Sequence, residues 1–403
     1  MSENTDKNKK PAIRFKGFQD TWEQRKLGDI FKYEQPQAYI VESTEYDDKN
    51  DIPVLTAGQS FILGYTDERF GIKEANEDNP VIIFDDFTTS SHYVDFPFKI
   101  KSSAMKLLTL NNPNDDTHCT FNVLQNIGYV PVSHERHWIS TFAKFNVLLP
   151  KSSSEQKQIG AYFRNLDNLI ALHQRKLEKL KNVKKSMLEK MFPQNGSNVP
   201  QIRFAGFTAP WEQRKLSEFG KATGGTSIES EFVDGGKYKV ISIGSYSETS
   251  KYTDQGIRAN KTRKTENRIL NKNDLTMILN DKTASGNIIG RVLLINADDS
   301  YVFNQRTERI EVYKNDFEPE FLYQLLNADH IRSKIIQASQ GNTQIYVNWS
   351  VISELVYQIP SSKDEQEKIA RYFRNFDNLI TLHQHKLEKL QNIKKSLLEK
   401  MFV

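Results

Sequence analysis

Residues 155–192 read EQKQIGAYFRNLDNLIALHQRKLEKLKNVKKSMLEKMF, and the chain contains this stretch twice. Residues 365–402 read EQEKIARYFRNFDNLITLHQHKLEKLQNIKKSLLEKMF, with 28 of 38 aligned positions identical. Most of the changes are mild, such as Val183 to Ile393. Two such similar copies in one chain predict two equivalent structural halves.

A shorter repeat precedes each copy of the long one. Residues 13–27 read IRFKGFQDTWEQRKL, and residues 202–216 read IRFAGFTAPWEQRKL. The segments that follow these short repeats, 28–150 and 217–360, share little sequence with each other. The chain is therefore a duplicated frame that holds two different inserts.

The long repeat has the composition of a helix. It is rich in Leu, Lys, Glu and Gln, which are strong helix formers. Ser152 with Glu155, and Ser362 with Glu365, fit a capping box, in which two side chains satisfy each other's free backbone donors. At ~1.5 Å per residue, each copy predicts a rod of roughly 55 Å.

One face of each predicted helix is apolar, with steps of three and four residues as in a coiled coil. An ordinary bundle helix is the simpler interpretation of this stripe. Because the two copies are so alike, we expect them to pack against each other and to leave room for partner helices. The residues predicted to pack against helices are Leu166, Leu169, Leu177, Leu180, Phe376, Leu379, Leu387 and Leu390.

The short repeat carries aromatic residues at matching places. An aromatic set of this kind could stack on bases, but its position before each insert favours a structural role. The residues are Phe15, Phe18 and Trp22 in the first copy, and Phe204, Phe207 and Trp211 in the second.

The length and composition are those of a protein with two or three domains. The chain has 403 residues, of which 26% are charged and 37% hydrophobic. The longest apolar runs are too short to span a membrane, and residues 1–10 do not resemble a signal peptide. Cys119 is the only cysteine, which excludes an internal disulfide and leads us to expect a cytoplasmic protein.

The net charge of +4 is unevenly distributed. Segment 151–192 carries +6 and segment 361–403 carries +3, whereas insert 28–150 carries −9 and insert 217–360 carries −1. The net charges of the chain and of its inserts therefore do not by themselves indicate nucleic-acid binding. Any contact of the inserts with DNA must come from local loops, or partners must supply the positive charge.

Both inserts are predicted to be mixed α/β, with short strands separated by turns. In each, a compact apolar strand precedes a polar loop: 81–84 before 85–92, and 275–279 before 280–287. Short hydroxyl and amide side chains at a strand end suit the reading of base edges, and they suit ordinary turns equally. The other predicted strands are 54–55, 61–63, 105–110, 145–149 and 288–295.

The candidate DNA-binding residues fall in these loops and in one basic cluster that could contact phosphate. A solvated loop is the alternative for the basic cluster. The loop candidates are Thr88, Thr89, Ser90, Ser91, His92, Lys282, Thr283, Ser285 and Asn287, and the basic cluster is Lys261, Arg263, Lys264, Arg268 and Lys272.

The motifs of catalysis are missing from the sequence, so no catalytic residue is predicted. We find no phosphate-binding loop, no dinucleotide motif and no Asn-Pro-Pro-aromatic run. Asp85 and Asp86 are neighbours that would point to opposite faces of a strand. Cys119, His134 and His137 lack the paired spacing of a zinc site. No metal site is predicted either.

The duplicated frame, the dissimilar inserts and the Glu-Gln helix starts after Pro150 and Pro360 resemble the specificity subunit of a type I restriction–modification enzyme. WEQRKL in both short repeats and Thr-Gly-Gly-Thr at 223–226 support the resemblance. It implies that each insert is a target recognition domain that reads one half of a split site in double-stranded DNA. It also implies that the helices dock two modification (methyltransferase) subunits, which restriction (translocase–nuclease) subunits join.

The resemblance implies that this chain binds no cofactor, and that S-adenosylmethionine, ATP and Mg are held by the partner subunits. The expected fold is α+β, with two mixed α/β recognition domains separated by two long antiparallel helices. A coiled-coil scaffold and a stand-alone DNA-binding protein are the alternatives. The expected segments are a flexible tail at 1–12, recognition domains at 13–150 and 202–360, spacer helices at 151–192 and 361–403, and a linker at 193–201.

Overall fold

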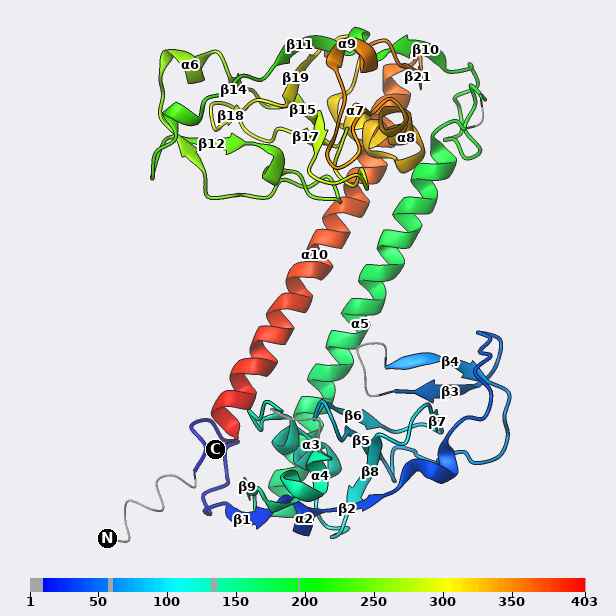
Figure 1. The fold of residues 1–403 in the computed structure, drawn as a ribbon, viewed down its shortest axis with the longest axis vertical. Helices are drawn as coiled ribbons and strands as arrows, with labels where there is room; N and C mark the ends of the chain where they lie inside the picture. Colours follow the sequence, from blue (N-terminus) through cyan, green and yellow to red (C-terminus); the bar gives the residue numbers. More distant parts are fainter. Residues whose placement is uncertain (1–9, 57–60, 132–135, 195, 403) are drawn as a thin grey trace. The chain divides into compact units, whose positions relative to one another are not determined.

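The computed structural model describes residues 10–56, 61–131, 136–194 and 196–402 (Figure 1). Most of the predicted flexible tail, residue 195 of the predicted linker, and His134 lie outside these residues. Within the described part of the chain, no helix is long and apolar enough to cross a membrane.

The chain forms two compact units. Unit 1 comprises residues 1–174 and 384–403, and unit 2 comprises residues 175–383. Two long helices, α5 (Ser153–Met191) and α10 (Lys363–Met401), each contribute one segment to each unit. The two predicted rods are therefore present, each 39 residues long.

Unit 1 is built on two small sheets. Strands in the order β2-β8-β5-β6 form an antiparallel sheet, and β4-β3-β7 form a second sheet in which β3 and β7 are parallel. β1 pairs with β9. The elements are β1 (Glu23–Lys26), α2 (Leu27–Ile30), β2 (Phe31–Glu34), β3 (Ile52–Leu55), β4 (Ile62–Thr66), β5 (Val81–Asp85), β6 (Ser91–Val94), β7 (Lys99–Ile100), β8 (Met105–Leu110), α3 (Thr117–Gln125), α4 (His137–Ser140) and β9 (Asn146–Leu149).

Unit 2 contains sheets of order β11-β19-β15-β17 and β13-β12-β18-β14, and the pairs β10-β21 and β16-β20. The strands are β10 (Glu212–Lys215), β11 (Gly220–Gly224), β12 (Tyr238–Ile241), β13 (Arg258–Ala259), β14 (Ile269–Leu270), β15 (Leu275–Ile278), β16 (Asn280–Asp281), β17 (Val292–Leu294), β18 (Tyr301–Phe303), β19 (Thr307–Val312), β20 (Ile345–Tyr346) and β21 (Val356–Ile359). The short helices are α6 (Arg263–Glu266), α7 (Pro319–Asn327), α8 (Asp329–Gln337) and α9 (Trp349–Ile352).

The two inserts share one topology although their sequences differ. The sheet β2-β8-β5-β6 has the same order and the same antiparallel pairing as β11-β19-β15-β17. The parallel pair β3-β7, with β4 antiparallel at its edge, corresponds to β12-β18 with β13. The duplication therefore extends to these two sheets of each insert, whereas β14 and the pair β16-β20 have no counterpart among the described strands of unit 1.

Both faces of the central strand β5 are buried, which explains its continuous run of apolar residues. Ile82 and Phe84 enter the core beneath the helices, whereas Val81 and Ile83 enter a second core on the other face. A strand buried on both faces has no polar alternation, as the run at 81–84 predicted.

In each unit the start of one long helix packs beside the end of the other. In unit 1, Lys394 Nζ lies 2.6 Å from Asp167 Oδ1. In unit 2, the corresponding ion pair joins Lys184 Nζ and Asp377 Oδ1 at 2.7 Å. The predicted antiparallel pairing of the repeats is confirmed within each unit.

A buried carboxylate fixes the start of each long helix. Arg14 donates from Nε and Nη2 to Glu155 Oε1 and Oε2, at 2.6 and 2.7 Å, and Trp22 Nε1 lies 3.4 Å from Oε1. The same clamp recurs in unit 2, where the corresponding residues are Arg203, Trp211 and Glu365. The short repeat therefore has a structural role, as predicted.

The clamp corrects the predicted capping box. Glu155 N donates to Ser152 Oγ at 3.4 Å, so half of the first box forms. The Glu155 carboxylate does not accept the second hydrogen bond of the box, from the backbone N–H of Ser152, because Arg14 binds both of its oxygens. A charged bidentate partner is stronger than a backbone amide.

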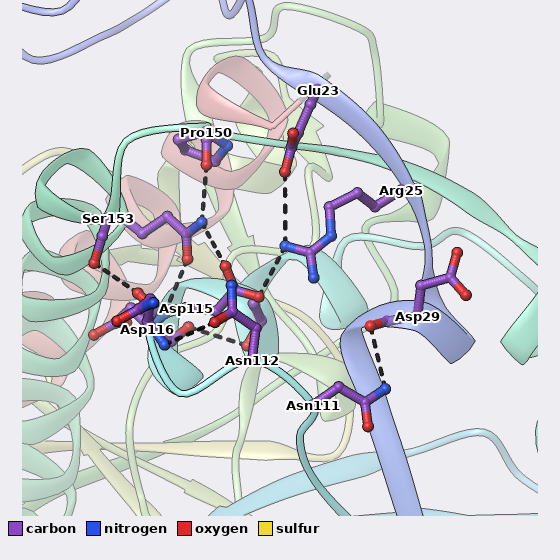
Figure 2. A network of polar contacts seen from close by, with 12 residues as sticks. Glu23, Arg25, Asp29, Asn111, Asn112, Asp115, Asp116, Pro150 and Ser153 are labelled. Carbon is purple, nitrogen blue, oxygen red and sulfur yellow. Dashed lines mark hydrogen bonds and ion pairs between the residues drawn. The ribbon is translucent and has the colours of Figure 1, made fainter.

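The next residue of each long repeat, a glutamine, ties the helix to the insert. Gln156 Nε2 donates to Pro150 O and Asp115 Oδ1, and its Oε1 accepts from Asp116 N. Its partners Pro150, Asp115 and Asp116 are labelled in Figure 2. Gln366 makes the corresponding contacts to backbone groups in unit 2. The Glu-Gln dipeptide is thus a joint between the frame and each insert.

Several predicted strand boundaries differ from the structure by one or two residues, and two strands differ by three residues or more. The strand predicted at 288–295 covers only β17, because Arg291 N donates to Ile288 O and Gly290 adopts φ +72°, which makes a turn. The strand predicted at 61–63 begins at Ile62 and continues to Thr66.

Candidate nucleic-acid interface

Strands β11, β15 and β19 meet at one end of the four-stranded sheet of unit 2. Gly225 N donates to Thr307 O at 2.8 Å, and Leu279 N donates to Arg306 O at 2.9 Å. These bonds hold together three segments, which are 225–228, 279–291 and 304–306, of which the second begins with the short strand β16. The predicted loop and the Thr-Gly-Gly-Thr motif therefore lie at the same end of one sheet.

The loop after β15 is organised by the buried carboxylate of Asp281. Its Oδ1 accepts from Thr283 N at 3.0 Å and from the Thr283 hydroxyl at 3.1 Å, and its Oδ2 accepts from Ile288 N at 2.8 Å. Burial acts to raise the pKa of Asp281, but these donors hold it below its usual value. The ionised carboxylate thereby fixes both ends of the loop.

A buried arginine of α8 supports the same loop from beneath. Arg332 Nη1 donates to Gly286 O at 2.7 Å and to Ile289 O at 3.0 Å. Burial, together with the nearby charge of Arg291, lowers the pKa of Arg332 to about 10. Sequence reasoning missed Arg332 because it lies more than 40 residues away along the chain.

The predicted residues of this loop lie on its exposed side. Lys282, Thr283, Ser285 and Asn287 are all exposed. The Thr283 and Ser285 hydroxyl oxygens are 2.6 Å apart, and Asn287 Nδ2 donates to Glu248 Oε1 at 2.9 Å. These are hydrogen-bonding groups on a fixed loop, a geometry that direct base reading requires.

Three residues of the predicted basic cluster lie at or beside α6. Lys264 Nζ is 3.5 Å from Glu231 Oε1, and Lys261 Nζ is 3.7 Å from Glu266 Oε1. Arg263 is exposed and has no ion pair with the residues that the structure describes. Exposed pairs of this kind are weak, so these cations remain free to exchange partners with phosphate.

Arg268 connects the basic cluster to the end of the sheet. Its Nε donates to Thr226 Oγ1 at 3.2 Å, and its guanidinium lies over the Phe303 ring, 5.5 Å from the centroid. Lys272 is exposed beyond β14. The structure thus brings Arg268 to the Thr-Gly-Gly-Thr segment and leaves Lys272 outside the contacts described for the cluster.

The corresponding end of the sheet in unit 1 has the same construction. Asp86 N donates to Ala104 O at 3.0 Å, which joins the loop after β5 to the loop before β8. Lys101 N donates to Leu55 O at 3.0 Å, which adds the end of β3. The first predicted recognition loop therefore occupies the place that 279–291 occupies in unit 2.

Three of the five predicted residues lie in this first loop. Asp85 Oδ1 accepts from Thr88 N at 3.1 Å, and the Thr88 and Ser90 hydroxyl oxygens are 2.8 Å apart. Thr89 adopts φ +60°, a left-handed conformation that is uncommon for a β-branched residue. A conformation of this kind persists only where its surroundings hold it.

The other two residues were wrongly assigned to the loop. Ser91 and His92 begin strand β6, where Ser91 pairs with Phe84 and His92 pairs with Ile83. The His92 ring stacks on Phe61 with centroids 4.3 Å apart. Any contact of His92 with DNA would therefore involve a residue of the sheet.

Two lysines of unit 1 are fully buried in ion pairs. Lys99 Nζ lies 2.6 Å from Glu68 Oε2, and Lys106 Nζ lies 3.3 Å from Asp86 Oδ2. These cations are unavailable to phosphate. Because their acidic partners Glu68 and Asp86 are buried with them, the net negative charge of the first insert is unchanged. Asp86 also accepts from Trp138 N at 3.0 Å.

No group of residues that could hold a metal occurs in the described ranges of the chain. Asp85 caps a turn and Asp86 pairs with a lysine. Cys119 is buried, which raises the pKa of its thiol, and His134 lies outside the described residues. The structure does not assemble Asp85 and Asp86 into a metal site, and the second candidate of the sequence includes a residue outside the described ranges.

The predicted helix-packing residues divide into three groups. Leu166 and Leu177 are buried, whereas Leu169 and Leu379 are each 44% exposed. Leu180, Phe376, Leu387 and Leu390 are half-buried. Two further leucines, Leu172 at 44% and Leu382 at 47% exposure, occupy equivalent places in the two repeats.

Residues 19–182 and 209–392 each match the family model of the type I restriction modification DNA specificity domain. The chain belongs to this family. It is a DNA-specificity chain with two recognition domains and not an enzyme. The two matches together include both long helices almost to their ends.

Two curated relatives are type I restriction enzyme specificity subunits. The EcoR124I/EcoR124II subunit of Escherichia coli is 43% identical over 153 residues, which are 36% of this specificity chain and 37% of the relative. The MjaVIII subunit of Methanocaldococcus jannaschii is 22% identical over 396 residues, 94% of this chain and 91% of the relative.

A solved structure shares the fold of the specificity chain. The S subunit of a type I restriction–modification system from M. genitalium matches with a TM-score of 0.70, 13% identity, and coverage of 98% of this chain and 99% of the other. At that identity, the likeness concerns the fold alone.

Proposed function

We propose that this chain is the specificity subunit of a type I restriction–modification complex that reads a bipartite site in double-stranded DNA. Recognition domain 1, residues 13–150, reads one half-site, and recognition domain 2, residues 202–360, reads the other. The observation that carries the proposal is the shared sheet end, where polar loops gather in both inserts although the insert sequences differ.

The structure of these loops supports direct reading of bases. In each, the carboxylate of an aspartate accepts from loop amides: half-buried Asp85 in the first loop and buried Asp281 in the second. In recognition domain 2, Lys282 lies in the loop itself, and Arg268 contacts the neighbouring Thr226 segment. Hydroxyl, amide and guanidinium groups on a rigid support are the groups that read base edges in the major groove.

The charge of recognition domain 1 supports a role inside a complex. Its insert carries −9 in the sequence, and two of its lysines are buried with acidic partners, so fewer of its cations can reach phosphate. Phosphate contacts contribute most of the affinity for DNA. We infer that modification subunits supply much of this contact, and that recognition domain 1 contributes mainly base discrimination.

The exposed leucines of the long helices support docking of those subunits. Leu169 and Leu172 are exposed on α5, and Leu379 and Leu382 are exposed at the equivalent positions of α10. Two equivalent apolar patches suit two copies of one partner. We propose two modification subunits on these patches, with restriction subunits joining from outside, and with S-adenosylmethionine, ATP and Mg bound by the partners.

The docking proposal is tested by charge substitution on one patch. The double variant Leu169→Lys, Leu172→Lys is co-expressed with tagged modification subunits, and the stoichiometry of the purified complex is measured by native mass spectrometry. Loss of one modification subunit is the expected result. The double variant Leu379→Lys, Leu382→Lys is the matched control and should lose the other. Full assembly with both doubles would contradict the proposal.

The recognition proposal is tested by exchanging one insert. Residues 28–150 are replaced by the equivalent segment of a relative, and the chimera is co-expressed with its modification subunits. Sequencing of methylated DNA should show a change in one half-site only. Exchange of 217–360 is the matched control and should change the other half-site. Coupled changes in both halves would contradict independent reading.

A further inference from the structure

The two four-stranded sheets place Lys106 and Glu308 at the same position. The last residues of β8 and β19 pair with the first residues of β2 and β11, and Lys106 and Glu308 each lie four residues before that end. Toward the other end of the strand, Lys106 lies two residues after Ala104, whose carbonyl accepts from Asp86 N. Glu308 likewise lies two residues after Arg306, whose carbonyl accepts from Leu279 N. The registers of the two sheets therefore coincide here.

Lys106 is satisfied by two neighbouring residues. Its Nζ lies 3.3 Å from Asp86 Oδ2 and donates to Gln35 Oε1 at 2.9 Å. Asp86 is the residue that donates to Ala104 O. Gln35 follows β2 directly, opposite Lys106. These contacts compensate the burial of the ammonium group.

Glu308 lacks both partners. The position of Asp86 is taken by Leu279, which donates its amide to Arg306 O, and the position of Gln35 is taken by Gly224, which pairs with Glu308. Glu308 is only 5% exposed, yet it has no hydrogen bond or ion pair with any residue that the structure describes. Burial raises its pKa to about 7. A buried carboxylate without a partner is costly to the fold.

The carboxyl group lies directly beneath an exposed glycine. A Cβ atom on Gly224 would lie 3.4 Å from Glu308 Oε2, so any side chain there would cover the carboxyl group. Gly224 leads into the Thr226 segment, to which the Arg268 guanidinium is bonded. The charge of Arg268 acts on Glu308 and lowers its pKa. A donor and an acceptor thus flank the same loop.

A base edge in the major groove matches this combination. Cytosine and adenine each carry an exocyclic amino group that donates, and a hydrogen-bond acceptor lies beside it in the same base pair. We propose that Glu308 reads the exocyclic amino group of one base, N4 of cytosine or N6 of adenine, in the half-site of recognition domain 2. Arg268 donates to the neighbouring acceptor. The inference rests on the proposed function of this domain.

The test uses the complex with its modification subunits. The wild-type site is mapped by sequencing methylated DNA, and the mapping is repeated for Glu308→Met, which keeps a similar size but has no oxygen to accept from an amino group. Discrimination at one position of the second half-site, where the wild type requires cytosine or adenine, should fall about tenfold. The first half-site should be unchanged. The matched control is Glu311→Met, at an exposed position of the same strand, which should leave the whole site unchanged.

A second measurement does not depend on the stability of the variant. Duplexes are prepared in which each amino-bearing base of the second half-site is replaced in turn by its analogue without the amino group, 2-pyrimidinone for cytosine or purine for adenine. One analogue should weaken wild-type binding about tenfold in a gel shift and leave Glu308→Met binding unaffected, because methionine has no oxygen to accept from the amino group. The analogue that has this effect identifies the base.

The outcomes separate this inference from the proposed function. If exchange of the inserts changes one half-site each, but every analogue weakens the wild type and Glu308→Met equally, Glu308 does not read a base. If Glu308→Met alters both half-sites together, its role is structural and the inference is overturned. If exchange of the inserts leaves the site unchanged, the proposed function itself is wrong.

Discussion

Replacement of Gly160 by alanine tests the close approach of α5 to α3. A Cβ atom at position 160 would lie 1.9 Å from Asp116 Oδ1 and 3.1 Å from Cys119 N. Asp116 is the N-cap of α3, and its Oδ1 accepts from Cys119 N at 2.7 Å. In the second repeat the position is Ala370, which is buried. The cap of α7, Glu318, makes no side-chain bond there.

The magnitude follows from three opposing effects. Alanine in place of glycine favours a helix interior by ~1 kcal/mol. Against this, the Asp116 side chain must move, which removes a cap contributing ~1 kcal/mol. Crowding against the backbone of α3 adds ~2 kcal/mol. We therefore expect Gly160→Ala to destabilise unit 1 by about 2 kcal/mol.

Cys119 provides a local assay because it is the only cysteine and is buried. A loss of about 2 kcal/mol should raise the rate at which a thiol reagent labels Cys119 by about 30-fold. In an Asp116→Ala background the cap and the clash with Asp116 Oδ1 are already absent and only the crowding at Cys119 N remains, so the same substitution should cost less, about 1 kcal/mol. Ala370→Gly is the matched control and should leave the labelling rate unchanged. A wild-type rate for Gly160→Ala would refute the reasoning.

Three further predictions concern buried charges. Glu155→Gln leaves Arg14 without its counter-charge and should destabilise unit 1 by about 3 kcal/mol. Thiol labelling of Cys119 should therefore become faster. The control Glu365→Gln should leave that rate unchanged, and equal labelling rates in the two variants would contradict the role of the clamp. Arg332→Met removes the hydrogen bonds that support the second recognition loop. Gel shifts with mismatched sites should then show weaker discrimination between bases in the second half-site alone. An equal loss of discrimination in both half-sites would contradict the prediction. The pKa of Glu308 is raised by burial to about 7, so the folded state binds more protons than the unfolded state between about pH 4.5 and 7. Its contribution to stability is therefore present at low pH, and the free energy of unfolding of the wild type relative to Glu308→Gln should fall by about 2.5 kcal/mol from pH 5 to pH 8. Urea titrations at each pH measure this difference, and a constant difference would contradict it.

The repeat made the frame predictable from sequence. Long helices follow from local composition, and two nearly identical helices predict a common packing arrangement. The functions of Glu155 and Gln156 could not be predicted, because their partners lie in the short repeat and in the insert. The Ser-x-x-Glu spacing suggested a capping box that is local, and a distant arginine replaced half of it.

The candidate site was less predictable than the frame. Polar loops after apolar strands identified Thr88 and Thr283 as candidates, because strand ends are marked by local composition. Glu308 has no such mark: it sits in an ordinary alternating strand, and only the register with Gly224 shows that it lacks a partner. Register depends on hydrogen bonds between distant segments, and the chain's two inserts share too little sequence to be aligned without it.

The division of the chain between the two units has a consequence for the order of folding during synthesis. Unit 2 is one continuous segment, 175–383, whereas unit 1 needs residues from both ends of the chain. Phe402 packs in the core of unit 1, with its ring 6.0 Å from that of Trp22 and 5.7 Å from that of Phe163. Synthesis of unit 1 therefore begins before that of unit 2, but the core of unit 1 can be completed only after all of unit 2 has been synthesised.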